Sequence, residues 1–170
     1  MISGRQQPPP RYSRRALPPY RHLPGLTPHP ERHPAGHSFG RPEPTPPPPD
    51  PERWRENELF LYGVDLFNRG YWWEAHAAWE SLWRQTERNS RSRRFFRGLI
   101  QLSAALLKLR AGRPEGAEKL IRRGMENLRH VARGGEERFM GVPIRELISR
   151  AGAWAAGDAG EAPTLVLYSP

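Results

Sequence analysis

Proline is concentrated at the start of this chain. Of the 20 prolines, 15 lie within residues 1–50. Proline lacks a backbone N–H donor and clashes with the preceding helical turn, so this segment cannot propagate a helix or a central strand. It also has few apolar side chains to offset the entropy cost of ordering the chain. The sequence therefore predicts a disordered arm, rich in proline and arginine, over residues 1–51.

Four histidines recur along this arm, namely His22, His29, His33 and His37. On a helix, their spacing would form a stripe of metal ligands, but the prolines between them prevent the helix. The arm is better suited to a flexible tether, or to a ligand for a proline-recognising module.

The rest of the chain is long enough for one core. From Glu52 onward there are 170 − 51 = 119 residues, which excludes two globular domains. We expect a helical domain over 52–158 and a tail over 159–170. The chain has no cysteine, which excludes disulfides, thiolate metal sites and cysteine nucleophiles. No apolar run reaches the length of a membrane span, and no apolar segment near Met1 resembles a secretory signal. We therefore expect a cytoplasmic protein without a membrane partner.

Helical periodicity begins after the proline-rich arm. We expect Asp50 to cap the first helix. The pattern Gly70–Ala75 recurs as Gly112–Ala117, and in both places one helix ends at the glycine and the next begins. The fold class predicted is all-α, a compact bundle of about five helices built from two antiparallel hairpins, with the fifth helix as a lid. The expected helices span about 51–68, 72–87, 91–111, 114–133 and 143–156.

The second predicted helix carries the most unusual polar pair. On a helical wheel, His76 lies within a stripe of tryptophans that includes Trp83, and Glu80 lies at the border of that stripe. Burying an ionisable pair costs several kcal/mol per charge unless hydrogen bonds or a metal compensate. Gln101 of the third helix is a further candidate for the same site.

Several interpretations of this pair remain open, namely a metal site, acid–base catalysis and a role in helix packing. His76 and Glu80 are one helical turn apart and can share a divalent transition metal, but a zinc site needs three or four ligands. His130 lies off its helix's apolar stripe and is a poor third ligand, so further ligands would come from elsewhere, including a second copy in a homodimer. Alternatively, Glu80 and Gln101 hydrogen-bond a buried His76 and fix the helix packing. Glu80 can also pair with Arg84 on the surface.

Three blocks of sequence resemble the bacterial and archaeal family called domain of unknown function 309. The family's hallmark, His-x-x-x-Glu-x-x-Trp or Tyr, is met by His76, Glu80 and Trp83. The blocks are FNRGYWWEAHAAWESLW at 67–83, RFFRGLIQLSAAL at 94–106 and GRPEGAEKL at 112–120.

Other positions extend this resemblance to about residues 55–135. The Gly-Leu-Ile-Gln segment is met by Gly98–Gln101, and a Gly-Ala pair by Gly116 and Ala117. Arg113 departs from the asparagine common at that turn. The resemblance implies an all-helical fold and a suspected metal site at the hallmark, but no established activity.

Two other functions compete with a metal or ligand site. Paired helices with glycine at the turns look like tetratricopeptide-type hairpins, which present a protein-binding face. The net charge of +9 favours nucleic acid, although 25 of the 27 basic residues are arginine, which a bias toward GC-rich codons would also produce. The candidate phosphate contacts are Arg91, Arg93, Arg94 and Arg97. No phosphate-binding loop and no catalytic motif is present, so no enzyme class is indicated.

Overall fold

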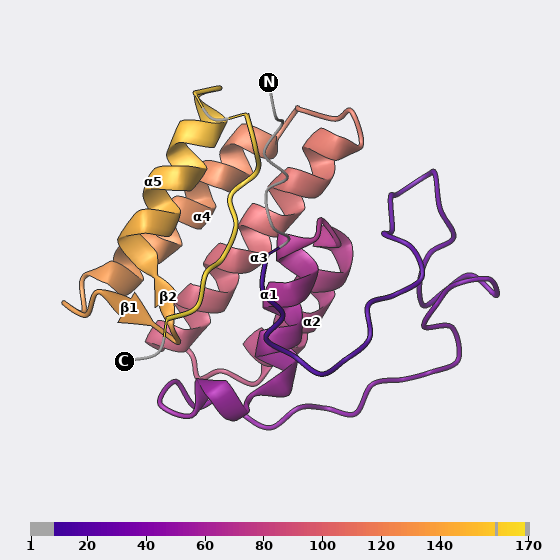
Figure 1. Cartoon of the computed structure of the whole chain (residues 1–170), viewed down its shortest axis with the longest axis horizontal. Helices are drawn as coiled ribbons and strands as arrows, with labels where there is room; N and C mark the ends of the chain where they lie inside the picture. The colour runs from indigo at the N-terminus through magenta and orange to yellow at the C-terminus, as the bar shows by residue number, and fades with distance from the viewer. Residues whose placement is uncertain (1–8, 159, 169–170) are drawn as a thin grey trace, which may run out of the picture.

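The computed structural model describes residues 9–158 and 160–168. Within them, five α-helices form the body of the molecule, and the only strands are two short ones in an antiparallel pair (Figure 1). The all-α bundle predicted from the sequence is confirmed. The helices are α1 (Glu58–Asn68), α2 (Trp72–Arg84), α3 (Arg91–Arg110), α4 (Ala117–Ala132) and α5 (Ile144–Ala155), with a 3₁₀ turn η1 (Trp54–Glu56) before them and strands β1 (Arg138–Phe139) and β2 (Val142–Pro143) before α5.

The first helix begins later than the sequence predicts. Asp50 caps only a turn, in which its Oδ1 accepts the N–H of Glu52 at 2.9 Å. Asn57 caps α1 instead, because its side chain accepts the N–H of Phe60 at 2.9 Å. An amide side chain at this position satisfies one of the free N–H groups of the first helical turn.

Two antiparallel hairpins, α1–α2 and α3–α4, pack against each other through α2 and α3. Gly70 and Gly112 follow α1 and α3 with φ of 75° and 67°, a conformation in which glycine carries no steric penalty. Ala75 and Ala117 are both buried at the start of the following helix. The repeated glycine and alanine pattern therefore corresponds to two equivalent helix–turn–helix units.

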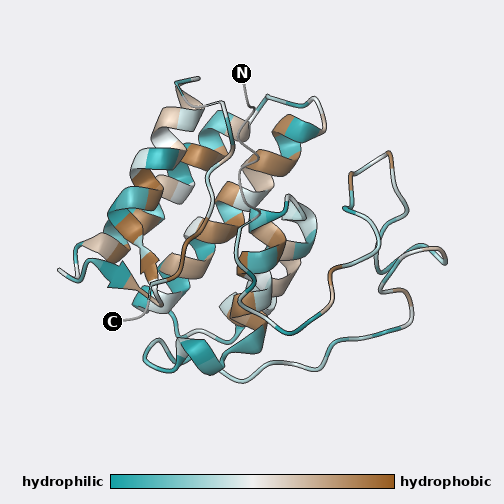
Figure 2. Ribbon diagram, viewed as in Figure 1, coloured by the Kyte–Doolittle hydropathy of each residue, from teal (hydrophilic) through white to brown (hydrophobic). Residues whose placement is uncertain are grey.

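The core is apolar and rich in aromatic rings. Figure 2 shows hydrophobic and hydrophilic residues alternating along the helices, and Phe60, Phe95 and Phe96 are fully buried and in mutual ring contact. The fifth helix packs on α4. No described helix combines the length and the apolar character that crossing a bilayer requires.

The C-terminal tail lies extended over the bundle. The side chain of Asn68 at the end of α1 makes two hydrogen bonds of 2.7 Å with the backbone of Leu165. The N–H of Tyr168 donates to the carbonyl of Gly141 at 2.9 Å. The tail thereby ties α1 to the segment before α5.

The proline-rich arm has no regular secondary structure where the structure describes it. Residues 9–50, which we call the N-terminal strap, contain no helix or strand, as their proline content requires. In the structure, this strap makes hydrogen bonds to Asp65 of α1 and Glu74 of α2, and the disorder of the arm stays a prediction. Local sequence patterns do not reveal these bonds, because Tyr12 and Asp65 are 53 positions apart and His22 and Glu74 are 52 positions apart. Residues 1–8 of the predicted arm, and Ala159, Ser169 and Pro170 of the predicted tail, lie outside the described residues.

Candidate functional site

The histidine–glutamate pair of the sequence hallmark lies at the surface of α2. The Nε2 atom of His76 is 3.7 Å from Glu80 Oε2, and the side chains are 34% and 37% exposed. Glu80 also pairs with Arg84 at 3.0 Å. Partial burial lowers the pKa of His76 below 6.5, while the charge of Glu80 and the backbone of Ile100 oppose the shift. The pair is brought together as predicted, but it is half-exposed rather than buried.

The orientation of α2 explains this difference. The helix turns Ala75, Trp79 and Leu82 toward the core, all at most 1% exposed. This core-facing side of α2 is rotated away from the centre of the tryptophan stripe, so His76 lies at the edge of the buried surface. The exact rotation of a helix depends on its neighbours, which a helical wheel does not contain.

The metal site remains a prediction. Within the described residues, no group of three or more His, Cys, Asp and Glu side chains is arranged to hold a metal ion. His130 lies near Arg133, whose Nη1 is 3.2 Å from His130 Nδ1. The structure therefore brings together two candidate ligands, His76 and Glu80, whereas a zinc site requires at least three protein ligands.

The structure does not bring Gln101 to this pair. Its Oε1 accepts a hydrogen bond of 2.9 Å from Asn127 Nδ2, so the amide faces α4. Trp83 is half-buried beneath Arg93, whose guanidinium carbon lies 4.0 Å from the ring centroid. The expected hydrogen bond between Gln101 and His76 is not among the contacts of the described residues.

Two of the four candidate phosphate-binding arginines, Arg91 and Arg93, are half-buried and bind backbone carbonyls. Arg91 donates to the carbonyl of Val131 at 3.0 Å and pairs with Glu136. Arg93 donates to the carbonyls of Trp83 and Thr86, both at 3.3 Å. These two side chains tie the α2–α3 turn and the end of α4 together.

Arg94 and Arg97 are exposed. Arg94 makes a long contact of 3.4 Å with Asn127 Oδ1, which leaves most of its guanidinium open to solvent. Phosphate binding by these two residues stays a prediction.

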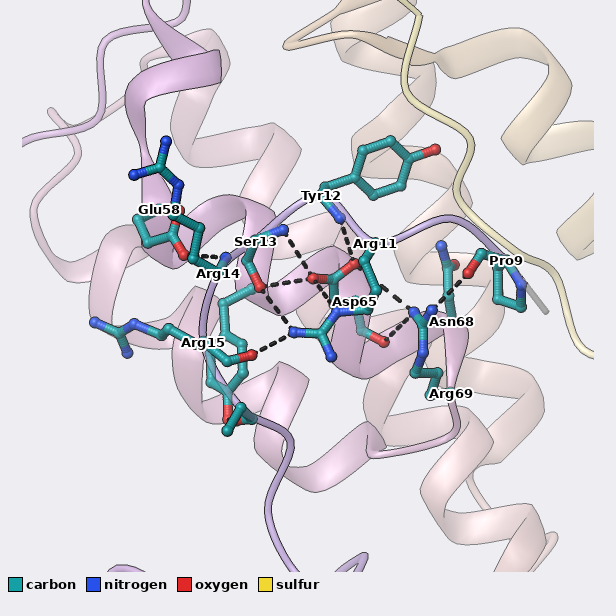
Figure 3. Close-up of polar contacts among 12 residues, drawn as sticks. Pro9, Arg11, Tyr12, Ser13, Arg14, Arg15, Glu58, Asp65, Asn68 and Arg69 are labelled. Atoms are coloured by element: carbon teal, nitrogen blue, oxygen red, sulfur yellow. Dashed lines mark hydrogen bonds and ion pairs between the residues drawn. The ribbon is translucent and has the colours of Figure 1, made fainter.

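The most extensive polar site was not predicted from the sequence. Asp65 of α1 is fully buried, yet its carboxylate faces the strap and receives donors from it (Figure 3). Its Oδ1 accepts the N–H of Tyr12, and its Oδ2 accepts the N–H and the hydroxyl of Ser13, at 2.9, 2.9 and 2.6 Å. Arg11 Nε donates to Oδ2 at 2.9 Å, and Arg69 approaches Oδ1 at 3.7 Å.

Further contacts hold the strap beside this carboxylate. Glu58 accepts the N–H of Arg14 at 2.6 Å, and the hydroxyl of Tyr62 donates to the carbonyl of Ala16 at 3.1 Å. Arg69 donates to the carbonyl of Pro9 at 2.5 Å. One face of α1 thus binds the backbone of residues 9–16.

Glu74 of α2 is the second buried carboxylate. It is 6% exposed, and its Oε1 accepts the N–H of His22 at 2.8 Å and lies 3.2 Å from His37 Nε2. The rings of His22 and His29 pack edge-on against Trp73, with centroids 5.2 Å away. Three of the four arm histidines, His22, His29 and His37, therefore contact α2 through hydrogen bonds or ring packing.

A signal for this site was present in the sequence. Asp65 lies between Val64 and Leu66 in a mostly apolar helix, and a buried carboxylate requires donors. The donors come from residues 11–17, a proline-free run between two groups of prolines. Proline has no N–H to donate, so this run was the part of the arm best able to bind an acceptor.

The helices that carry both carboxylates also match a known family. The sequence model described as Domain of unknown function (DUF309) matches residues 60–120. Over that segment, the chain is similar to this family. The resemblance seen in the sequence is thereby confirmed. The chain matches no curated protein.

Asp65, Glu74 and the hallmark residues His76 and Glu80 all lie in the matched segment, as does Gln101. The N-terminal strap and α5 lie outside it. The domain of unknown function 309 therefore supplies the acceptors of the Asp65 and Glu74 sites, whereas the donors that occupy them come from another part of the chain.

Proposed function

We propose that the α1–α2 hairpin is a docking module for extended peptide segments, and that residues 9–22 of the strap occupy it in this chain. The observation that carries the proposal is the buried carboxylate of Asp65, whose two oxygens accept the consecutive backbone N–H groups of Tyr12 and Ser13. A protein-interaction module of helical hairpins is the function that this geometry supports best.

The chemistry of the contact suits peptide recognition. Backbone N–H donors are common to all non-proline residues, so they supply affinity with little dependence on sequence. The contacts of Arg11 and the Ser13 hydroxyl with Asp65 Oδ2 add a preference for an arginine and a hydroxyl two positions apart. A partner segment would therefore be extended, basic, and free of proline where its N–H groups meet Asp65.

Charge-assisted hydrogen bonds make this acceptor hard to replace. Each bond to a charged group contributes about 1.5–3 kcal/mol. In Asp65→Asn, an amide –NH₂ replaces one carboxylate oxygen and faces donors of the strap. We expect docking of the segment to weaken about 10- to 100-fold, since about 1.4 kcal/mol corresponds to a factor of ten.

The test uses the full chain with a specific protease site in place of the prolines at 46–49, of which Pro47 and Pro48 are exposed. After cleavage, we expect the strap to co-elute with the helical domain on gel filtration. Excess labelled peptide covering residues 9–23 should then exchange into the vacated position. With Asp65→Asn, the strap should separate from the domain.

Glu146→Gln is the matched control. Glu146 is a surface acid of α5 that pairs with Arg150 at 2.6 Å and makes no strap contact among the described residues, so this variant should retain the strap. Separation of the wild-type strap on cleavage, or equal retention in Asp65→Asn, would contradict the docking module.

A further inference from the structure

A cavity of about 850 Å³ lies between the strap and the α1–α2 hairpin. One wall comes from α1 and α2 and includes Tyr62, Trp73 and Ala77, and the other comes from the strap and includes Leu17 and His37. Figure 1 shows the strap looping outward beside α2 before it returns to α1. The volume is within the range of small-molecule sites in proteins, which is about 300–1,000 Å³.

The cavity wall contains a buried carboxylate with unused acceptor capacity. Glu74 lines the cavity, and its side chain is 5% exposed. Its Oε1 accepts from His22 and contacts His37, but its Oε2 is buried and has no hydrogen-bond partner in the part of the chain that the structure describes. An unpaired buried carboxylate oxygen is costly. A donor in the cavity would relieve that cost once the Glu74 side chain rotates to turn Oε2 toward it.

The rest of the wall favours a positively charged donor. Its other carboxylates are Glu31 and Glu43, of which Glu43 pairs with Arg15 of the strap at 2.9 Å, and its one guanidinium is Arg41. Aromatic rings on the wall can contact the apolar part of a ligand and attract a cation to their faces.

We infer that this cavity binds a primary ammonium ion on a small apolar body, with Glu74 Oε2 accepting the ammonium N–H and the rings of Trp73 and Tyr62 contacting the apolar part. This site is distinct from the peptide-docking contact at Asp65. It requires the strap to lie as the structure shows it, but it does not require the hairpin to bind peptides in trans.

The test compares 2-phenylethylamine with the neutral 2-phenylethanol, titrated into the full chain and followed by NMR or calorimetry. We expect the amine to bind at least about ten times more tightly than the alcohol, since the carboxylate interaction is lost with the charge. Glu74→Gln keeps an oxygen that accepts the His22 N–H but replaces Oε2 with an amide –NH₂ group, which cannot accept from the ammonium ion. It should reduce amine affinity about tenfold and leave the alcohol unchanged.

A second pair of variants keeps the test independent of Glu74. Ala77→Trp should fill the cavity and abolish binding, whereas Ala155→Trp, at an exposed position of α5, should not.

Amide exchange of Tyr12 and Ser13 reports whether the strap is docked in each variant. With the strap docked, equal affinity for amine and alcohol, or unchanged amine affinity in Glu74→Gln, would overturn the ammonium site alone. Loss of strap protection in the wild type would instead contradict the docking module.

Discussion

The two helical hairpins share one topology but differ in what covers them. In α3–α4, the helices meet at Gly98 and Gly124, where a Cβ added to either glycine would lie 3.2 Å from the carbonyl oxygen of the other. In α1–α2, the side that receives the strap carries Asp65 and Glu74, both buried. Polar contacts therefore hold the strap on the first hairpin, whereas close backbone packing holds the two helices of the second hairpin together.

This difference shows what a buried carboxylate does in a small helical domain. An apolar helix face can be covered by any apolar neighbour, but a buried carboxylate requires donors at defined positions. The backbone of a proline-rich segment supplies them only where proline is absent. Asp65 and Glu74 therefore set the register at which the strap lies on α1–α2. If the two hairpins are stabilised independently, a substitution in α3–α4 should leave the strap docked on α1–α2.

The largest effect should come from Gly63→Ala in α1. A Cβ at this position would lie 2.2 Å from Nε1 of Trp79, a fully buried and rigid ring. Overpacking of this kind costs about 1–3 kcal/mol. We expect a lower midpoint in urea unfolding followed by circular dichroism, together with loss of strap protection in amide exchange. An unchanged midpoint would show that α1 and α2 are not held by this contact.

Gly98→Ala should have a smaller effect on the other hairpin. Its Cβ would lie 2.8 Å from Cγ of Leu128, but replacing a helical glycine with alanine also gains about 0.5–1 kcal/mol. We expect a net loss of about 1 kcal/mol in urea unfolding, with the strap amides still protected.

Gly152→Ala in α5 is the matched control for Gly98→Ala. Its Cβ would meet only Met125 Sδ, at 3.8 Å, an ordinary contact. We expect this variant to be stabilised by about 0.5–1 kcal/mol. Destabilisation of both variants by the same amount would mean that the close approach of α3 and α4 contributes nothing specific.

Strap docking should weaken on acidification. Burial is the main reason that the pKa of His22 lies below 6.5, and the neighbouring His29 and His37 lower it further, whereas Glu74 and a hydrogen bond with the Pro28 backbone oppose the shift. A released strap therefore binds protons more readily than a docked one, so docking is strongest above about pH 6.5 and declines as the pH falls below it.

Amide exchange of His22 at pH 7.5 and 5.5, corrected for intrinsic rates, measures this effect. We expect lower protection at the acidic pH, and little change between the two in His22→Gln. Greater protection of the wild type at acidic pH would reverse the predicted sign.

The smallest effect should come from Glu80→Gln in the hallmark pair. Glu80 and its partners His76 and Arg84 are at least one-third exposed, and surface ion pairs of this kind contribute about 0.5 kcal/mol or less. We expect the urea midpoint to change by an amount close to experimental error. A loss above about 1 kcal/mol would show that the pair is a packing device after all.

Much of the fold could be predicted from local features. Proline content marks the strap, and the glycines at 70 and 112 mark the ends of α1 and α3. The start of α1 was placed too early because Asp50 and Asn57 are both good caps, and the choice between them depends on the turn at Trp54–Glu56.

The site was predicted less well than the fold. His76 and Glu80 are neighbours on one helix, so their spacing alone brings them together. Gln101 and its partner Asn127 lie on different helices, and the backbone N–H donors to Asp65 and Glu74, from Tyr12 and His22, lie more than 50 residues away. No local pattern encodes such pairings, which arise only when the helices and the strap pack.

The sequence by itself determined that this chain is a helical bundle with a proline-rich segment before it, because helix periodicity, glycine and proline act over a few residues. Only the tertiary structure decided that the strap docks on α1–α2, and that α2 buries Glu74 while leaving His76 half-exposed. Those outcomes depend on which distant groups can satisfy a buried charge, and that is a property of the packed molecule.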